Sequence, residues 1–291
     1  MSGPSLQKIG FLSSSDGTSL FFRASDLKAK KGAVVFVHGF GEHSGRYSHL
    51  AYQLSLASFA SLSFDLRGHG RSDGHRAYVN SFEDYFLDVE RAIDEARSLF
   101  NVKKVFIIAH SMGGLIASFL APSLNKKLSG LILSSPAFGL TIPIPLWKSM
   151  FGRALSFLWP KFYLSSGVKG HELTTNMRFL KDYHRDPLVQ RLITPRLYTE
   201  ITRYQAISSL AAKNLDLPIL MQLAGKDSLV SADESKKFFS LILSKDRSLK
   251  LYEDLLHEIY NEQKRDRPIN DLINWMEKRC ENNLPNKLLP D

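Results

Sequence analysis

The sequence predicts an α/β protein built on a mostly parallel sheet with helices on both faces. Short apolar runs alternate along the chain with longer segments of helical periodicity, and this alternation is typical of parallel sheets. Most of the short runs are mainly apolar and continuous instead of alternating regularly with polar residues. Continuous apolar runs are expected for strands that are covered by helices on both sides.

The strands can be assigned in order. Residues 8–12 and 18–23 flank Ser-Ser-Ser-Asp-Gly, which is typical of a hairpin turn. Six further apolar runs follow as candidate strands: Ala33–Val37, Ser61–Phe64, Lys104–Ala109, Leu131–Ser134, Pro218–Leu223 and Leu249–Tyr252.

The clearest helix is predicted over residues 82–100. Ser81 and Asp84 have the spacing of a capping box, in which each side chain bonds the other residue's backbone N–H. The apolar residues recur at helical spacing, at Phe82, Phe86, Val89, Ile93 and Ala96. A second helix is predicted over 114–120, directly after the run Lys104–Ala109.

The rhythm of strands and helices is interrupted once. About eighty residues separate the sixth strand from the seventh, far more than one crossover helix requires. We therefore divide the chain into a first core part at 1–137, a helical cap at 138–212 and a second core part at 213–291. The cap is expected to form a lid over the carboxyl ends of the strands.

Composition narrows the class of protein. The 291 residues are 44% hydrophobic and 23% charged, which is ordinary for a soluble globular protein. Cys280 is the sole cysteine, so an internal disulfide and a thiolate metal cluster are excluded. We expect it in the last helix. The first residues lack the basic and apolar regions of a signal peptide, and no apolar run has the length of a membrane span. We expect a cytoplasmic protein.

The net charge of +9 is concentrated in the cap. Residues 141–185 contain seven positive and two negative side chains, so they contribute +5, and they include two of the three tryptophans. This pattern favours peripheral contact with a membrane or micelle, or an acyl tunnel, whereas simple packing of the cap onto the core is the alternative. Nucleic acid is disfavoured, because no basic recognition helix is visible. The apolar residues concerned are Ile142, Ile144, Leu146, Trp147, Met150, Phe151, Leu155, Phe157, Leu158 and Trp159.

A serine at the end of a strand is the candidate nucleophile. The stretch Ala109-His110-Ser111-Met112-Gly113-Gly114 has small residues two positions before and two after Ser111. This is typical of a nucleophile elbow, a sharp strand-to-helix turn that lifts the serine hydroxyl out of the sheet. Ala109 stands where glycine is usual, and a loop serine without catalytic role is the alternative.

A catalytic serine requires a general base and an acid that orients the base. In folds with such an elbow the order along the chain is Ser, acid, His. Asp227 follows the seventh predicted strand and His257 follows the eighth, so we predict a triad of Ser111, Asp227 and His257. Asp254 and Asp216 are weaker alternatives for the acid. No histidine pair has the HExxH spacing, and no metal or cofactor is expected.

An oxyanion hole needs two backbone N–H donors. Met112, directly after the nucleophile, and Phe40, in the loop after the third strand, are the candidates. That loop contains His38, Gly39 and Gly41, and its glycines allow the backbone to approach a substrate closely. A plain turn is the alternative explanation for the glycines.

Five motifs together resemble the monoacylglycerol lipase and lysophospholipase branch of the serine α/β-hydrolases. They are HGFGEHSGRY (38–47), DLRGHGRSDG (65–74), AHSMGG (109–114), AGKD (224–227) and HEIYNE (257–262). The resemblance implies an α/β-hydrolase fold with eight strands and a helical cap after strand six. It also implies that Glu42 and Arg46 organise the loop behind the oxyanion hole.

The resemblance implies hydrolysis of acyl esters of the monoacylglycerol or lysophospholipid type through an acyl-enzyme on Ser111. Alternatives on the same fold are a short-chain carboxylesterase, a proline-type aminopeptidase and, less favoured, a non-catalytic scaffold. The acyl chain, the head group and the oligomeric state stay open at this point. Because Cys280 is far in sequence from the triad, thiol reagents are expected to spare activity.

Overall fold

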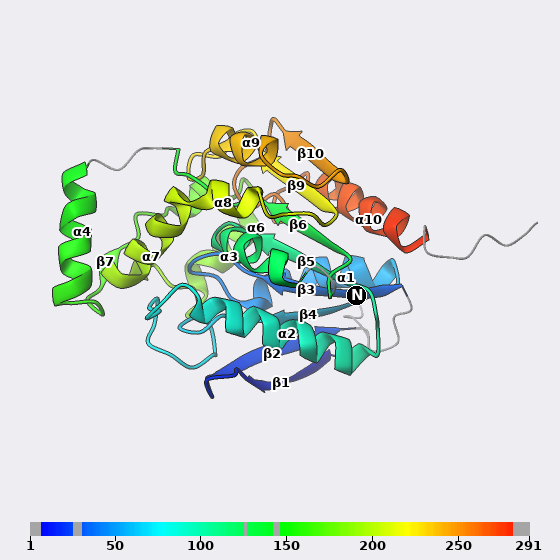
Figure 1. Ribbon diagram of the computed structural model, residues 1–291, viewed down its shortest axis with the longest axis horizontal. Helices are drawn as coiled ribbons and strands as arrows, with labels where there is room; N and C mark the ends of the chain where they lie inside the picture. Colours follow the sequence, from blue (N-terminus) through cyan, green and yellow to red (C-terminus); the bar gives the residue numbers. More distant parts are fainter. Residues whose placement is uncertain (1–6, 26–30, 125–126, 142–145, 282–291) are drawn as a thin grey trace, which may run out of the picture.

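The computed structural model describes residues 7–25, 31–124, 127–141 and 146–281, and within them an eight-stranded sheet has the order β1-β2-β4-β3-β5-β6-β9-β10 (Figure 1). β1 pairs antiparallel with β2 and β2 pairs antiparallel with β4, whereas all other neighbours are parallel. The fold class is thereby confirmed, and each predicted strand has become a strand of this sheet. They are β1 (Gln7–Ser13), β2 (Ser19–Ser25), β3 (Gly32–Val37), β4 (Phe59–Phe64), β5 (Val105–His110), β6 (Gly130–Ser134), β9 (Ile219–Ala224) and β10 (Arg247–Tyr252).

Burial explains the apolar runs. Every residue of β3, β4, β5, β6 and β9 is buried, because these strands lie inside the sheet and are covered on both faces. The edge strands β1 and β10 keep several exposed residues instead. Ser111 and Asp227 therefore follow fully buried inner strands, β5 and β9, whereas His257 follows the edge strand β10.

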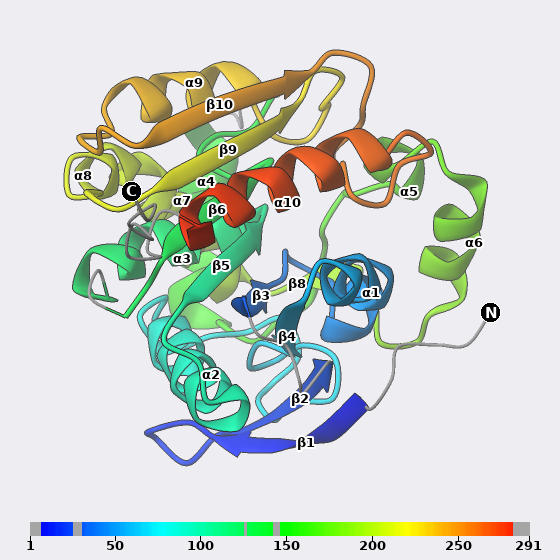
Figure 2. The same ribbon diagram turned by 90° about the vertical axis from the view of Figure 1, so that its right-hand side faces the viewer.

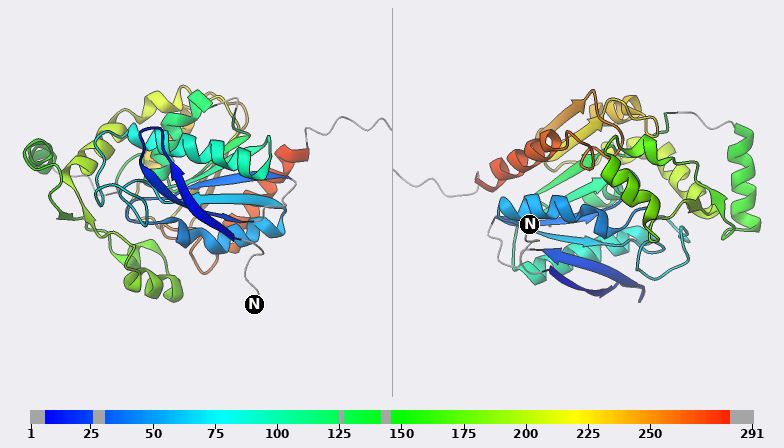
Figure 3. Two further views of the ribbon diagram at one scale, coloured as in Figure 1. Left: turned by 90° about the horizontal axis from the view of Figure 1, so that it is seen from below. Right: turned by 180° about the vertical axis from the view of Figure 1, so that it is seen from behind.

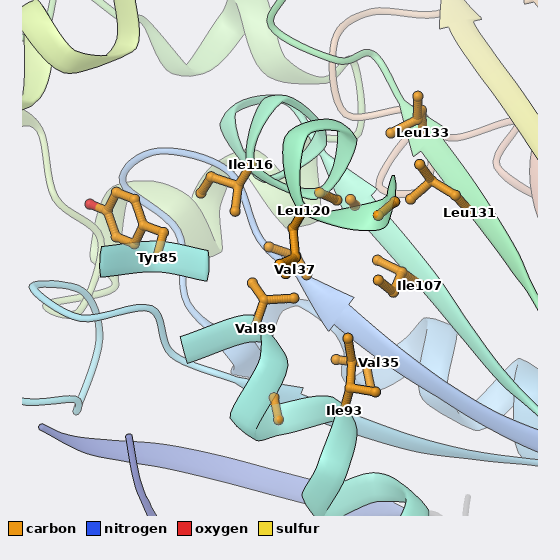
Figure 4. Packing of buried hydrophobic residues seen from close by; sticks show 14 of the residues in the cluster. Val35, Val37, Tyr85, Val89, Ile93, Ile107, Ile116, Leu120, Leu131 and Leu133 are labelled. Atoms are coloured by element: carbon orange, nitrogen blue, oxygen red, sulfur yellow. The ribbon is translucent and has the colours of Figure 1, made fainter. Parts of the chain in front are cut away.

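One face of the sheet is covered by helices that follow β4, β5 and β9. Figure 4 shows Val89 and Ile93 of one helix and Ile116 and Leu120 of another lying against valines and an isoleucine of β3 and β5. These side chains belong to one continuous buried cluster. The helices on this face are α2 (Asp84–Phe100), α3 (Met112–Leu120) and α9 (Ala232–Ser240).

The opposite face is covered by α1 (Ser48–Leu56) and α10 (Asp266–Glu281), which are seen in front of the sheet in Figure 2. Leu50 and Leu54 of α1 and Leu272 and Met276 of α10 are fully buried against β3, β5 and β9. Cys280 lies in α10, as predicted. The two helical layers hold the strand ends in fixed relative positions.

The predicted start of the helix over 82–100 needs correction. The helix α2 begins at Asp84, because residues 82 and 83 form a turn. Only half of the predicted capping box forms: the Asp84 carboxylate accepts the Ser81 N–H at 3.2 Å, but the Ser81 hydroxyl bonds the Glu83 carboxylate instead. The helix predicted over 114–120 begins two residues earlier, at Met112.

The chain between β6 and β9 forms short helices and a small two-stranded sheet. We keep the name cap segment for residues 138–212, and we propose that it acts as a lid over the carboxyl ends of the strands. Its elements are α4 (Leu146–Leu158), β7 (Leu164–Ser165), α5 (Gly170–Leu173), α6 (Met177–Arg185), β8 (Leu192–Ile193), α7 (Pro195–Ala206) and α8 (Ser208–Ala212).

The cap segment lies over the loops that follow three core strands. Backbone hydrogen bonds join Gln190 to Gly41 after β3, Thr194 to Ala77 after β4, and Glu258 after β10 to Leu173. Helix α4 packs on α7 and stands at the outer edge of the molecule (Figures 1 and 3).

Several apolar residues predicted for the cap surface cannot be placed. Ile142 and Ile144 lie outside the described residues, and so do the side chains of Leu146 and Trp147. In the part of the chain that the structure describes, no helix has the length and apolar character needed to cross a bilayer.

Candidate functional site

The turn between β5 and α3 holds Ser111 in a strained conformation. Its φ of 51° and ψ of −118° are unfavourable for a residue with a side chain. Gly113 is required next to it, since a Cβ there would lie 2.3 Å from the Val37 carbonyl oxygen. Ala109 is fully buried between β3 and β6, so a methyl group fits where glycine is usual. The observed turn has the geometry predicted for a nucleophile elbow.

His257 and Asp227 form a buried hydrogen-bonded pair. The Nδ1 atom of His257 lies 2.7 Å from Oδ2 of Asp227. The other carboxylate oxygen of Asp227 accepts the N–H groups of Leu229 and Val230, each at 2.9 Å. These contacts fix the carboxylate and leave the Nε2 atom of His257 available to a third group.

The two members of this pair shift each other's pKa. Burial works against the charged form of His257, but the Asp227 carboxylate outweighs it and raises the pKa of the ring. Burial likewise works against the ionised carboxyl of Asp227, but His257 and the two backbone N–H groups hold its pKa below the usual range. An ionised carboxylate beside a titratable imidazole is the arrangement of a general base and its orienting acid.

Ser111 and His257 line the same cavity, which has a volume of about 360 Å³. Among the described residues, no hydrogen bond joins the Ser111 hydroxyl to the His257 ring. Catalytic contacts are often long without substrate and shorten in the complex. Two of the three residues predicted for the triad, Ser111 and His257, therefore line one cavity, and Asp227 is joined to His257 behind it.

Both predicted oxyanion donors also line the cavity. Phe40 follows β3, and Met112 is the first residue of α3. Within the described part of the chain, neither backbone N–H has a hydrogen-bond partner. The N–H of Met112 is free for the general reason that the first residues of a helix lack an intrahelical acceptor.

The loop before Phe40 is held by buried side chains. Glu42 accepts the Gly39 N–H and the Tyr47 hydroxyl, each at 2.9 Å. His38 accepts the Leu66 N–H at Nε2, so its Nδ1–H donates to the Gly39 carbonyl oxygen at 2.7 Å. The close packing explains Gly39, since a Cβ there would lie 3.1 Å from Cβ of Ser111.

The cavity wall is mainly apolar. Its charged side chains are Glu42, Glu172 and Glu258, and no lysine or arginine is among the described residues that line it. The apolar and aromatic residues of the wall are Phe40, Met112, Ala137, Leu140, Val168, Leu173, Tyr183, Ile193, Tyr198, Ile201, Leu229 and Val230. Such a wall suits an acyl chain with a small polar end.

Known proteins resemble this chain in sequence and in fold. Residues 28–264 match the family described as serine aminopeptidase S33. The chain belongs to this family of serine α/β-hydrolases. Its fold is similar to the crystal structure of monoacylglycerol lipase from Paleococcus ferrophilus, with a TM-score of 0.82, 28% identity and coverage of 89% of this chain and 99% of the other.

Two relatives of this hydrolase have names that refer to lipid hydrolysis. Phospholipase YtpA of Bacillus subtilis is 31% identical over 235 residues, which are 80% of this chain and 90% of the relative. Human monoglyceride lipase is 30% identical over 263 residues, which are 88% of this chain and 85% of the relative. The predicted branch of the family is confirmed, and the protein is a serine ester hydrolase.

Sequence reasoning missed the part that Glu258 plays in this hydrolase. Arg46 bonds Glu42 at 3.0 Å and holds both carboxylate oxygens of Glu258, at 2.6 and 2.7 Å. The arginine thus joins the loop after β3 to the residue next to His257. The only available signal was the position of Glu258 beside the candidate base.

The two glutamates differ in acidity. Burial opposes ionisation of Glu42, but His110, Arg46 and His38 lower its pKa to about 2. Burial raises the pKa of Glu258 in spite of Arg46, because the Glu42 charge adds to the effect. Asn261 also donates to Glu258 at 2.7 Å. Arg46 therefore forms ion pairs with two buried carboxylates beside the site.

The motif at 65–74 contributes support to the same loop. Asp65 accepts the Ser44 N–H with one oxygen and the Arg71 N–H with the other, each at 2.7 Å. Of the rejected acids, Asp254 bonds Lys264 and Arg267, away from the His257 ring.

Proposed function

We propose that the hydrolase cleaves esters of single-chain acyl lipids by a Ser111–Asp227–His257 triad, with monoacylglycerols as preferred substrates. The observation that carries this proposal is the strained Ser111 facing the same cavity as a His257 ring held by Asp227. The coarser conclusion, a lipid ester hydrolase, agrees with the curated relatives.

The reaction that we propose has two steps. His257 accepts the Ser111 proton as the hydroxyl oxygen attacks the ester carbonyl, and the N–H groups of Phe40 and Met112 bind the oxyanion. The alcohol leaves with the proton from His257, and an acyl-enzyme stays on Ser111. Water then attacks this ester with His257 as base, which releases the fatty acid and restores the serine.

The charges of the cavity favour a neutral alcohol over a phosphate. The leaving alcohol takes its proton from His257, so it lies on the His257 side of the cavity, which Glu172 and Glu258 also line. Helix α5, which carries Glu172, is tied to the same loop by the hydrogen bond from Glu258 N–H to the Leu173 carbonyl oxygen, 2.8 Å. Glu42 and Glu258 are already paired with Arg46, so the carboxylate that a head group would meet is that of Glu172. A phosphate would lie near it with no lysine or arginine on the described cavity wall, which is costly, whereas a glycerol hydroxyl can donate to it.

A substrate panel tests the proposal. We expect monoacylglycerols to exceed lysophospholipids of equal chain length by at least about tenfold in kcat/KM, and Glu172→Gln to narrow this gap. Ser111→Ala is the control and should abolish turnover of p-nitrophenyl esters and labelling by a fluorophosphonate. Wild-type activity of Ser111→Ala would refute the triad.

The same panel separates the alternatives. Equal turnover of acetyl and long-chain esters would indicate a general carboxylesterase. Cleavage of aminoacyl-naphthylamides in preference to esters would indicate an aminopeptidase. An unlabelled wild-type protein without turnover would indicate a scaffold.

We propose further that the cap segment contacts a membrane or micelle at its outer edge. The side chains of Phe157, Trp159 and Phe162 are 82%, 62% and 57% exposed at the end of α4 and beyond it. Exposed Arg153 and Lys161 accompany them. Exposed aromatics interleaved with cations are typical of membrane interfaces.

Vesicle flotation tests this contact. The double variant Phe157→Ser/Trp159→Ser should lose most of its binding to anionic vesicles, because it removes two exposed aromatic rings. Leu243→Ser, at a residue 66% exposed beyond α9, is the matched control and should bind like wild type. Flotation of the double variant at the wild-type level, or no flotation of wild type, would reject the contact.

A further inference from the structure

The cap segment touches the loop of residues 38–47, here called the oxyanion loop, directly after Phe40. The Gln190 N–H donates to the Gly41 carbonyl oxygen at 2.9 Å. Gly41 has a φ of +75°, and a Cβ on it would lie 2.5 Å from the Gln190 carbonyl oxygen. Only glycine permits this approach of two backbones. Gly41, the residue directly after Phe40, is thus held by the cap segment through its carbonyl oxygen.

A side-chain contact reinforces this junction. The Nε2 atom of His43 lies 2.8 Å from Oδ2 of Asp186, the residue directly after α6. His43 accepts the Gly45 N–H at Nδ1, 3.2 Å away, so the proton of the neutral ring is on Nε2 and is donated to Asp186. The His43 side chain is buried, and that of Asp186 is 27% exposed.

Asp186 also orders the cap side of the junction. Its second oxygen accepts the Leu188 N–H at 2.8 Å, which fixes the turn that leads to Gln190. Burial opposes ionisation of Asp186, but the Leu188 N–H and His43 lower its pKa. One carboxylate therefore holds both the histidine of the oxyanion loop and the turn that bonds Gly41.

The remainder of the oxyanion loop is fastened to the core. Gly39 is held by Glu42, and Ser44 is held by Asp65. Between these two anchors, Gly41 and His43 have their contacts with the cap segment. The position of Phe40, which lies in this stretch, consequently depends on the cap segment as well as on the core.

We infer that Asp186 is a positioning residue, which acts through His43 and the turn to Gln190 to hold the Phe40 N–H where the oxyanion forms. The inference rests on the proposed function and extends it: the cap segment would complete the oxyanion hole in addition to covering the cavity. Removal of the Asp186 carboxylate lowers transition-state stabilisation while substrate still binds the rest of the cavity.

The test compares Asp186→Ala with Asp182→Ala, an exposed acid on the same helix. We expect Asp186→Ala to lower kcat on a p-nitrophenyl ester about 10- to 100-fold with KM changed less than about threefold. It should weaken binding of an acyl trifluoromethyl ketone, whose serine adduct carries an oxyanion, by the same factor as kcat/KM. Asp182→Ala should change neither quantity.

A double-mutant cycle separates positioning from general destabilisation. His43→Ala should lose less ketone affinity than Asp186→Ala, because it leaves the bond from Leu188 to Asp186 in place. The double variant should lose no more than Asp186→Ala alone, because the contact between the two side chains is already absent. Asp186→Asn, of equal size, keeps an oxygen that can accept from His43 and should lose less, which covers the case in which Asp186→Ala fails to fold.

Each outcome decides the inference. Wild-type kcat and ketone affinity in Asp186→Ala or in His43→Ala, or a loss confined to KM, or losses that add in the double variant, would overturn it while the proposed function stands. A wild-type protein that hydrolyses no ester would overturn the proposed function and this inference with it.

Discussion

The pKa of the His257 ring gives a direct test of its proposed role as general base. Its pKa is raised by Asp227 above the ordinary value of 6.5, and the ring must be neutral to accept the serine proton. The kcat/KM of a p-nitrophenyl ester should therefore rise with pH through an apparent pKa above 6.5. An acid limb below 6.5, or a flat profile down to pH 5, would contradict the assignment of His257 as base.

Glu258 should influence that limb. Its carboxylate adds to the field that stabilises the protonated His257 ring, so Glu258→Gln should move the acid limb to lower pH. Glu253→Gln, at an exposed residue on the same loop, is the control. The pair of pH profiles measures the effect, and equal limbs in both variants would show that Glu258 acts on structure alone.

Some site residues could be predicted from sequence and others could not. Ser111, Asp227 and His257 each follow a strand that an apolar run announces, so topology brings them to one edge of the sheet. Glu258 meets Arg46 across 212 residues, and Asp186 meets His43 across 143. Ordinary charged residues at such separations carry no spacing signal, because only the fold brings them together.

At the scale of elements, buried strands are easier to predict from sequence than helix ends and short helices. Strands inside the sheet are mainly apolar, because all of their residues are buried, and their positions are predictable from sequence. The start of α2 differs from the prediction by two residues, and the Ser81 hydroxyl there bonds Glu83 and not the helix backbone. The insertion after β6 was visible by length. Its short helices were not, since α5 spans only four residues and its contacts are with the loop after β10.

The elbow between β5 and α3 should tolerate no extra atom. Gly113→Ala would place a Cβ 2.3 and 2.6 Å from the carbonyl oxygens of Val37 and His38, so we expect a loss of about 3 kcal/mol in the free energy of unfolding. Gly17→Ala, where space is open but φ is +86°, should cost about 1 kcal/mol. Urea denaturation compares them, and equal losses would contradict the close packing of the elbow.

At the scale of the whole molecule, the net charge of +9 is unevenly distributed along the chain. More than half of it belongs to residues 141–185 of the cap segment, next to the exposed aromatic residues. Binding to anionic vesicles should therefore weaken steeply as salt rises from about 0.05 to 0.5 M, because the screening length falls below about 10 Å. Flotation that is independent of salt would show that apolar contact alone holds the protein.

Acyl transfer through Ser111 can be tested by trapping the acyl-enzyme. The wild-type protein is mixed with a long-chain p-nitrophenyl ester, quenched in acid within the first turnover and digested for mass spectrometry. We expect an acyl group on Ser111 in the wild-type protein and none at position 111 in Ser111→Ala. Ester hydrolysis with the acyl group on another residue, or with no covalent adduct in the first turnover, would contradict it.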